Sequence, residues 1–297
     1  MSNWRWTHKT TLKIAGQLQR LGIQVSARTV ARLLRKLRFS LRSNRKNISS
    51  GSRLGRDQQF GRIARLRKLF CRQGDPIISV DAKKRELVGN FKNAGVKWER
   101  GSTQVNDHDF RSQASGIALP YGIYDLQANR GSVFVGVSHE TSAFAVHSIC
   151  RWWKSEGCQR YPHSQRLLIL ADTGGSNSAT RGAWKDQIQQ RLCDDLGLTV
   201  TVAHYPSGAS KYNPIERRLF SQISRNWAAE PLTCFDKTLQ LIRNTTTTTG
   251  LKVRASLDRK DYPLKVKPSA ERLRQLKLTR HKFLPKWNYT IAPLNVK

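Results

Sequence analysis

Residues 166–220 constrain the fold most, because strand and helix patterns alternate there without a break. Residues 167–171 are all apolar, Asp172 ends the run, and a Gly-Gly pair soon stops regular structure. The segment TRGAWKDQIQQRLCDDLG has helical spacing, and LTVTVAHYP has the β-branched content of a second strand. The pattern predicts an α/β domain in which a buried strand brings the Asp172 carboxylate to an edge of the sheet.

Two further carboxylates occupy comparable positions. Asn213 is a good N-cap and Pro214 a good first helical residue, so Glu216 falls in the first turn of a helix. In DPIISVDAKKRE a short apolar run ends at Asp81. Two strand-end aspartates and a helical glutamate can hold two divalent cations, since Mg²⁺ prefers carboxylate oxygen. Two such ions can activate an attacking oxygen and stabilise a leaving oxygen during phosphodiester displacement.

Each of these acids also has an ordinary structural interpretation. An Asp after a strand is often a turn residue or a helix cap, and a Glu in a first helical turn complements the helix dipole. Three other acids compete with Asp81 for the first position. Asp125 also ends a strand-like segment. Asp107 and Asp109 lie between the strand that ends at Asp81 and this segment. The order of the residues alone leaves these alternatives open.

The charge of the chain narrows the class of partner. The sequence has 53 Lys and Arg against 20 Asp and Glu, a formal net charge of +33. So positive a protein is expected to bind a polyanion, most simply nucleic acid, with strong salt dependence. No apolar run approaches the ~20 residues that span a bilayer, and the N-terminus lacks a signal-peptide pattern. We therefore expect no membrane partner and a cytoplasmic, nucleoid-associated protein.

Residues 1–45 have the pattern of a small helix-turn-helix DNA-binding domain. In TLKIAGQLQRLG the apolar residues fall on one face, and in the next segment Ser26 is a good N-cap. The residues expected to be buried in these two helices are Leu12, Ala15, Leu18, Leu21, Ala27, Val30, Leu33, Leu34 and Leu37. The second helix would expose Arg28, Thr29, Arg32, Arg35 and Lys36 to DNA. The alternative is a helical hairpin with a solvated cationic face, and the net charge favours DNA.

The rest of the chain predicts a linker and one large domain. Residues 46–58 are polar, basic and rich in Ser and Gly, as in a linker, and 59–297 would form the catalytic domain with a basic C-terminal extension. The predicted order of its elements, with three strands before the Asp172 strand and helices between the last strands, matches an RNase H-like mixed sheet flanked by helices. Further predicted DNA contacts are Lys83, Lys84, Lys211 and Arg217. Lys83 and Lys84 could equally balance the acids.

Several longer motifs resemble one known family. The segments ISVDAKKRELVGNFKN, PYGIYDL, LLILADTGGSN, HYPSGASKYNPIERRLFSQISRNW and WNYTIAP closely resemble the Rhodopirellula-type (ISAzo) family of bacterial insertion-sequence DDE transposases, over nearly the whole chain. The resemblance implies an RNase H-like catalytic domain that uses Mg²⁺ or Mn²⁺, two ions per site, to cut and join the ends of its element. It places the catalytic and metal-binding acids on Asp81, Asp172 and Glu216, and so favours Asp81 over Asp125.

The resemblance also implies partners and alternatives. The partners would be double-stranded DNA, at element ends and target, and a second copy of the chain in a synaptic dimer or higher oligomer. Relatives carry more sequence before Arg5, which predicts a shortened N-terminal DNA-binding region here. Arg217 stands where a histidine is common, and Tyr212 replaces a tryptophan, but neither change removes a metal ligand. Two other functions remain open: a nuclease that cuts without joining, and an inactive or truncated transposase that only binds DNA.

Overall fold

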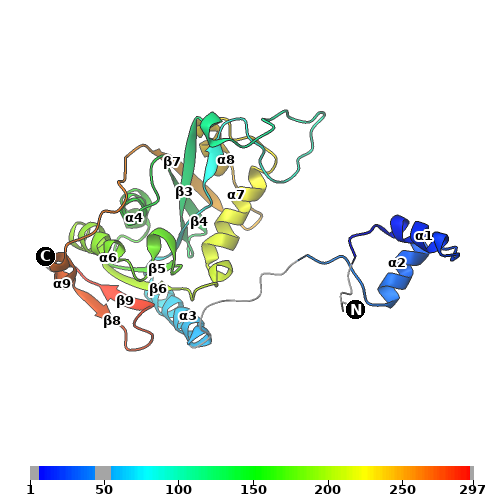
Figure 1. Cartoon of the computed structure of the whole chain (residues 1–297). Coiled ribbons are helices and arrows are strands. Elements are labelled where there is room, and N and C mark those ends of the chain that lie inside the picture. Colours follow the sequence, from blue (N-terminus) through cyan, green and yellow to red (C-terminus); the bar gives the residue numbers. More distant parts are fainter. Residues whose placement is uncertain (1–6, 44–54, 295–297) are drawn as a thin grey trace. The chain divides into compact units, whose positions relative to one another are not determined.

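The computed structural model describes residues 7–43 and 55–294. The chain divides into two compact units, 1–48 and 49–297 (Figure 1). Most of the predicted linker, residues 46–54, lies outside the described residues. Helix α3 (Arg56–Gln73) begins inside the remainder of that linker, because Gly55 in a left-handed conformation precedes it and Asp57 complements its first turn.

The N-terminal unit contains helices α1 (Thr11–Arg20) and α2 (Ala27–Lys36). Ser26 caps α2 as predicted, since its hydroxyl accepts a hydrogen bond from the Thr29 backbone N–H at 3.1 Å. Ala15 and Val30 are buried. The prediction of burial is wrong for four leucines, whose exposed fractions are 73% for Leu12, 75% for Leu21, 42% for Leu33 and 67% for Leu37. Two short helices share only one narrow contact stripe, so much of their apolar surface is left uncovered.

The larger unit is built on one mixed sheet, which has nine strands within the described residues. Its strands are β1 (Ile77–Ala82), β2 (Glu86–Val88), β3 (Gly116–Asp125), β4 (Arg130–Gly136), β5 (Arg166–Ala171), β6 (Thr199–His204), β7 (Lys252–Asp258), β8 (Leu278–Arg280) and β9 (Asn288–Ile291). The order is β7-β4-β3-β1-β5-β6-β9-β8, with β2 paired to β3. The pairs β1–β5, β5–β6 and β4–β7 are parallel, and β3 is antiparallel to both of its main neighbours.

Helices cover both faces of this sheet (Figure 1). Helices α4 (Ser142–Trp152) and α6 (Gly182–Ile188) bury Trp152 and Trp184 against one face. The other face is covered by α3, α7 (Ser221–Asn226) and α8 (Phe235–Arg243). Residues 167–171 are fully buried, which explains their unbroken apolar run. Shorter pieces complete the unit: α5 (Cys158–Arg160), α9 (Ala270–Gln275), the 3₁₀ turns η1 (Arg111–Gln113), η3 (Gly175–Asn177) and η5 (Ser210–Tyr212), and the π-helical η2 (Trp153–Gly157), η4 (Gln189–Asp194) and η6 (Glu216–Phe220).

One helix packs unusually close to the sheet. It runs through residues 214–226, as η6 followed by α7. A Cβ atom on Gly122 of β3 would lie 2.5 Å from the Phe220 ring and 2.8 Å from Ile215 Cδ1. Only glycine permits this approach, and the approach holds the first turn of the helix over the middle of the sheet.

The C-terminal extension departs from a simple basic tail. Its strand β9 pairs antiparallel with β6, and β8 pairs with β9. Tyr289 and Ile291 of β9 are fully buried in the core under α6. The segment after residue 264 therefore completes the sheet. In the described ranges 7–43 and 55–294, no helix combines the length and apolar character needed to cross a bilayer.

Candidate active site

Asp81 and Asp172 lie side by side at the carboxyl ends of two central parallel strands. Asp81 is the penultimate residue of β1, and Asp172 directly follows β5. Val80 of β1 pairs with Ala171 of β5 in the parallel register. The next residue along each strand is an aspartate, Asp81 after Val80 and Asp172 after Ala171. Parallel register at adjacent strand ends brings the two side chains to the same edge of the sheet, as the sequence predicts.

Glu216 reaches the same place from the helix over the sheet. It is the first residue of η6 and is partly buried. Gly122, against which this helix packs, is the direct partner of Asp81 across β1 and β3. The electrostatic coupling of Glu216 to both Asp81 and Asp172 places the three carboxylates in one cluster.

The cluster holds protons more tightly than free carboxylic acids do. Burial, then repulsion by Asp172, raises the pKa of Asp81 to about 8, although the Ala82 backbone N–H opposes this. Burial also raises the pKa of Asp172 to about 6, against the effect of a hydrogen bond from Asn213. Burial raises the pKa of Glu216 as well, and Lys83 opposes it. Crowded, half-buried carboxylates of this kind are stabilised in their ionised form by a cation.

Asn213 joins the three elements that carry these acids, and it is fully buried. Its Nδ2 donates to Asp172 Oδ1 at 3.2 Å and to the Val80 carbonyl at 3.4 Å. Its Oδ1 accepts a hydrogen bond from the Ser79 hydroxyl. Asn213 directly precedes the first helical residue, Pro214, as predicted, and its carbonyl accepts the Glu216 N–H at 3.1 Å; the side-chain cap comes instead from the Ser79 Oγ of β1, which accepts the Ile215 N–H at 3.0 Å. The sequence gives no signal for a cap supplied by a strand 136 residues away.

The backbone of Asp172 is held by a second buried group. His204 Nδ1 lies 2.8 Å from the Asp172 carbonyl oxygen, and its Nε2 lies 3.0 Å from the Tyr289 hydroxyl. Burial lowers the pKa of His204 to about 4 and keeps the ring neutral, so Nδ1–H can donate to that carbonyl. The Trp184 indole donates to the same Tyr289 oxygen at 2.9 Å. The C-terminal strand β9 thus supports the loop that carries Asp172.

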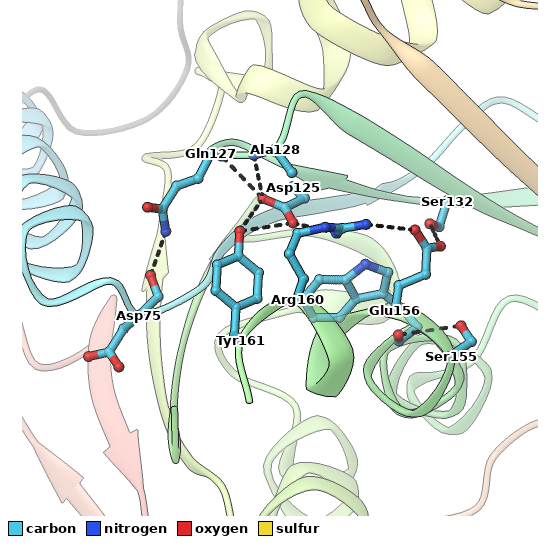
Figure 2. Close-up of polar contacts among 10 residues, drawn as sticks. Asp75, Asp125, Gln127, Ala128, Ser132, Ser155, Glu156, Arg160 and Tyr161 are labelled. Carbon is cyan, nitrogen blue, oxygen red and sulfur yellow. Dashed lines mark hydrogen bonds and ion pairs between the residues drawn. The ribbon is translucent and has the colours of Figure 1, made fainter. Parts of the chain in front are cut away.

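Asp125, the main rival of Asp81, lies at the opposite end of the strands. It pairs with Ile78 near the start of β1, roughly 10 Å along the strand from Asp81. Asp125 is fully buried, and Figure 2 shows its carboxylate in contact with several polar partners. Arg160 Nη1 approaches Oδ2 at 2.8 Å, the Tyr161 hydroxyl donates to Oδ1 at 2.9 Å, and the Gln127 and Ala128 N–H groups donate to Oδ1 at 3.1 Å. Asp125 therefore has a structural role. Asp107 and Asp109 are exposed in the loop before β3.

The predicted DNA-contacting residues are not equivalent in the structure. Lys83 is largely buried; its Nζ lies 2.8 Å from Glu86 and over the Trp227 ring. Its charge therefore balances nearby acids rather than facing solvent. The remaining predicted cations are exposed: Arg28, Arg32, Arg35, Lys36, Lys84, Lys211 and Arg217. Thr29 is partly covered, and its hydroxyl is 3.0 Å from that of Ser26.

Glu140 is a neighbour of the cluster that sequence reasoning missed. Its charge adds to the repulsion that raises the pKa of Asp81. Its Oε1 lies 3.2 Å from the position a Cβ would take on Gly175, and its Oε2 is 3.8 Å from Arg85. It precedes the N-cap of α4, where a glutamate is unremarkable in a sequence.

The donor chemistry of the cluster fits divalent ions of the Mg²⁺ or Mn²⁺ type. All three acids supply hard oxygen ligands, and burial, with mutual repulsion at Asp81 and Asp172, raises their pKa values, so a bound cation would favour their ionised forms. Among residues 7–43 and 55–294, no three His, Cys, Asp or Glu side chains converge closely enough to hold one ion. The acids thus fit the ions by ligand type and charge, and they are not gathered around a single point.

Fold and site together define a class of protein. The order β4-β3-β1-β5-β6, with β3 antiparallel and acids at the ends of β1 and β5, is that of an RNase H-like domain. The chain belongs to the family described as the Rhodopirellula transposase DDE domain, whose profile matches residues 1–293.

Solved structures with similarity to this chain include two of Mos1 transposase. A paired-end complex with the left transposon end is 15% identical, with a TM-score of 0.47, and a pre-cleavage transpososome is 14% identical, with a TM-score of 0.46. Each match covers 78% of this chain and 65% of the Mos1 chain, so this chain spans less than two thirds of their length. No curated protein matches it.

Proposed function

We propose that this protein is a DNA transposase that cleaves the ends of an insertion sequence and joins them to target DNA, with Mg²⁺ or Mn²⁺ as cofactor. The observation that carries the proposal is that Asp81 and Asp172 lie at the ends of adjacent parallel strands, with Glu216 near enough for its charge to raise the pKa of both. Membership of the transposase family supports the same reaction.

In this proposal the acids act together and are the metal-binding residues. Two bound divalent ions would supply activation of the attacking oxygen and stabilisation of the leaving oxygen. Asp81 and Asp172, on adjacent rigid strands, would share the ions, and Glu216 would complete one site from the helix. Asn213 would keep Asp172 in one orientation through its 3.2 Å hydrogen bond. Water would be the nucleophile for cleavage, and the freed 3′-hydroxyl of DNA the nucleophile for joining.

DNA would be held by exposed cations on both units. Lys84, Lys211 and Arg217 flank the carboxylates in the chain and are exposed. On the smaller unit, Arg28, Arg32, Arg35 and Lys36 are exposed on α2, and Thr29 lies among them. Such contacts position the phosphate backbone, and they should be strongly salt dependent. A synaptic dimer or higher oligomer on two DNA ends is part of the proposal.

A strand-transfer assay tests the joining step. Wild-type protein is mixed with pre-cleaved duplexes that end in a 3′-hydroxyl and with supercoiled plasmid, in Mg²⁺ and in Mn²⁺. Pre-cleaved ends that become joined to plasmid support the transposase. Nicking of plasmid without joining would identify a nuclease of the same fold. Metal-independent DNA binding with neither reaction would identify a DNA-binding protein only.

A further inference from the structure

A cavity of about 690 Å³ opens beside the edge strand β7. Its walls come from β4, β7, the ends of α4 and α8, and the π-helical turn η2. Phe134 lines the cavity and belongs to the core cluster that includes α4, as does Val80 of β1. Because side chains alternate along a strand, Asp81 points to the other face of the sheet. In the strand order, β3 and β4 lie between β1 and the edge strand β7, so the cavity at the β7 edge is separate from the carboxylate cluster.

The charge around the cavity is strongly positive. Four cations line it: Arg151, Lys154, Arg243 and Arg254. Its one lining carboxylate, Glu156, is already engaged, since Oε1 accepts the Ser132 hydroxyl at 2.6 Å and Oε2 lies 3.2 Å from Arg160 (Figure 2). Arg151 is partly balanced by Asp258 at 3.5 Å, and its guanidinium lies 4.7 Å from the centre of the Phe134 ring.

The remaining cations are available to a ligand. Lys154 and Arg254 are exposed, and within the described residues neither forms an ion pair. Arg243 uses only its Nε, which donates to the Ala255 carbonyl at 2.9 Å. Charged residues on an edge strand also prevent edge-to-edge pairing, and that could explain Arg254 alone. It does not explain why Arg151 and Lys154 converge on the same cavity from a helix.

Phosphate is the chemistry that this cavity matches. Arginine and lysine are the residues that neutralise phosphate, and Ser256, whose oxygen accepts a hydrogen bond from Arg151, adds a hydroxyl donor. Lys252 and Arg254 lie on one face of β7, about 6.6 Å apart, so cations continue along the strand beyond the cavity. A row of cations suits a chain of phosphates better than one isolated anion.

We propose that this cavity binds backbone phosphates of a DNA segment other than the one being cut at the carboxylates. The inference rests on the proposed function, because it adds a second DNA contact to the same protein. It gives the β7 edge a role in holding DNA that the acidic cluster does not require.

The test compares two double variants of the full chain with equal charge loss. Lys154→Gln with Arg254→Gln alters the cavity, and Lys68→Gln with Arg72→Gln alters exposed cations of α3. Binding to a short duplex is measured by fluorescence anisotropy without metal, between 50 and 300 mM salt. The logarithm of DNA affinity falls with the logarithm of salt concentration, and loss of two phosphate contacts should make this fall less steep by roughly 2 in the cavity variant. The α3 variant should keep the wild-type slope.

Other outcomes overturn the inference in separable ways. Equal slopes for the two variants would show that the cavity makes no particular DNA contact, while wild-type binding would leave the proposed function standing. No wild-type binding at any salt would overturn both. A second arm adds inorganic phosphate or a mononucleotide and follows thermal unfolding. Stabilisation of the wild type but not of the cavity variant, together with equal DNA slopes, would identify a small phosphate ligand in place of DNA.

Discussion

At the scale of single residues, the protonation of Asp81 controls how stability depends on pH. Its folded pKa of about 8 exceeds the ordinary 3.8, so the folded state keeps a proton that the unfolded chain loses. The stability from this group is complete below about pH 4 and is lost as pH rises through 8. Asp81→Asn should therefore equal the wild type near pH 4 and exceed it in unfolding free energy, and so in Tm, at pH 9 without metal, by up to ~6 kcal/mol.

Thermal unfolding followed by circular dichroism from pH 4 to 9 measures this difference. Parallel Tm curves for the two proteins would contradict a raised pKa at Asp81. Added Mg²⁺ should stabilise the wild type at pH 8 more than it stabilises the variant, because an ion that binds ionised carboxylates favours the folded state.

Asn213 gives a second prediction at this scale. Asn213→Asp keeps the shape of the side chain and places a carboxylate against Asp172 Oδ1, where Nδ2 now donates at 3.2 Å. Like charges should cost about 2 kcal/mol of unfolding free energy at pH 8. The cost should shrink at pH 5, where the pair can share a proton. Urea unfolding at both pH values measures it, and a cost that does not change with pH would argue for a purely steric effect.

The candidate acids could be predicted from sequence because each follows a strong local pattern. Asp172 ends an unbroken apolar run, and Glu216 follows a Pro that starts a helix. The partners of these acids could not be predicted in the same way. Ser79, Asn213 and His204 contact each other or Asp172 across separations of 32 to 134 residues. Such contacts depend on tertiary packing, and no regular spacing of residues in the sequence indicates them.

At the scale of elements, the close packing of residues 214–226 on β3 is the feature that positions Glu216. Gly122→Ala would place a methyl group 2.5 Å from the Phe220 ring, and the helix would have to shift. We expect a loss of about 1–3 kcal/mol. Gly61→Ala is the matched control, since Gly61 lies in α3 with nothing within 4 Å of its added Cβ. There alanine should be neutral or stabilising by up to ~1 kcal/mol. Urea unfolding compares them, and equal effects would contradict the packing account.

Helices and strands could be predicted where a local sequence pattern determines them. Strands β5 and β6 were predicted because an apolar run marks one and β-branched residues mark the other. Strand β2 is only three residues long, too short for a strand pattern to mark it, and a loop follows it. The burial predicted for α1 and α2 is wrong for four leucines, because helical spacing identifies an apolar face and not its partner.

At the scale of the whole molecule, a net charge of +33 surrounds a small cluster of buried acids. The cationic surface would draw DNA to the protein, and the acids would repel it until cations balance them. On this account, DNA cleavage and joining therefore require a metal ion, whereas DNA binding does not. The order of elements along the chain could be predicted from the alternation of strands and helices, whereas the insertion of β9 beside β6 could not, since pairing across 85 to 91 residues is set by the fold.

The most direct test is cleavage of supercoiled plasmid in Mg²⁺ and in Mn²⁺ by the wild type, Asp172→Asn and Asp109→Asn. Asp109 is an exposed acid outside the cluster, so its variant controls for the loss of one negative charge. The account predicts metal-dependent cutting by the wild type and by Asp109→Asn, and none by Asp172→Asn, with equal DNA binding by all three. Cutting that persists in Asp172→Asn would contradict the carboxylate cluster as the active site.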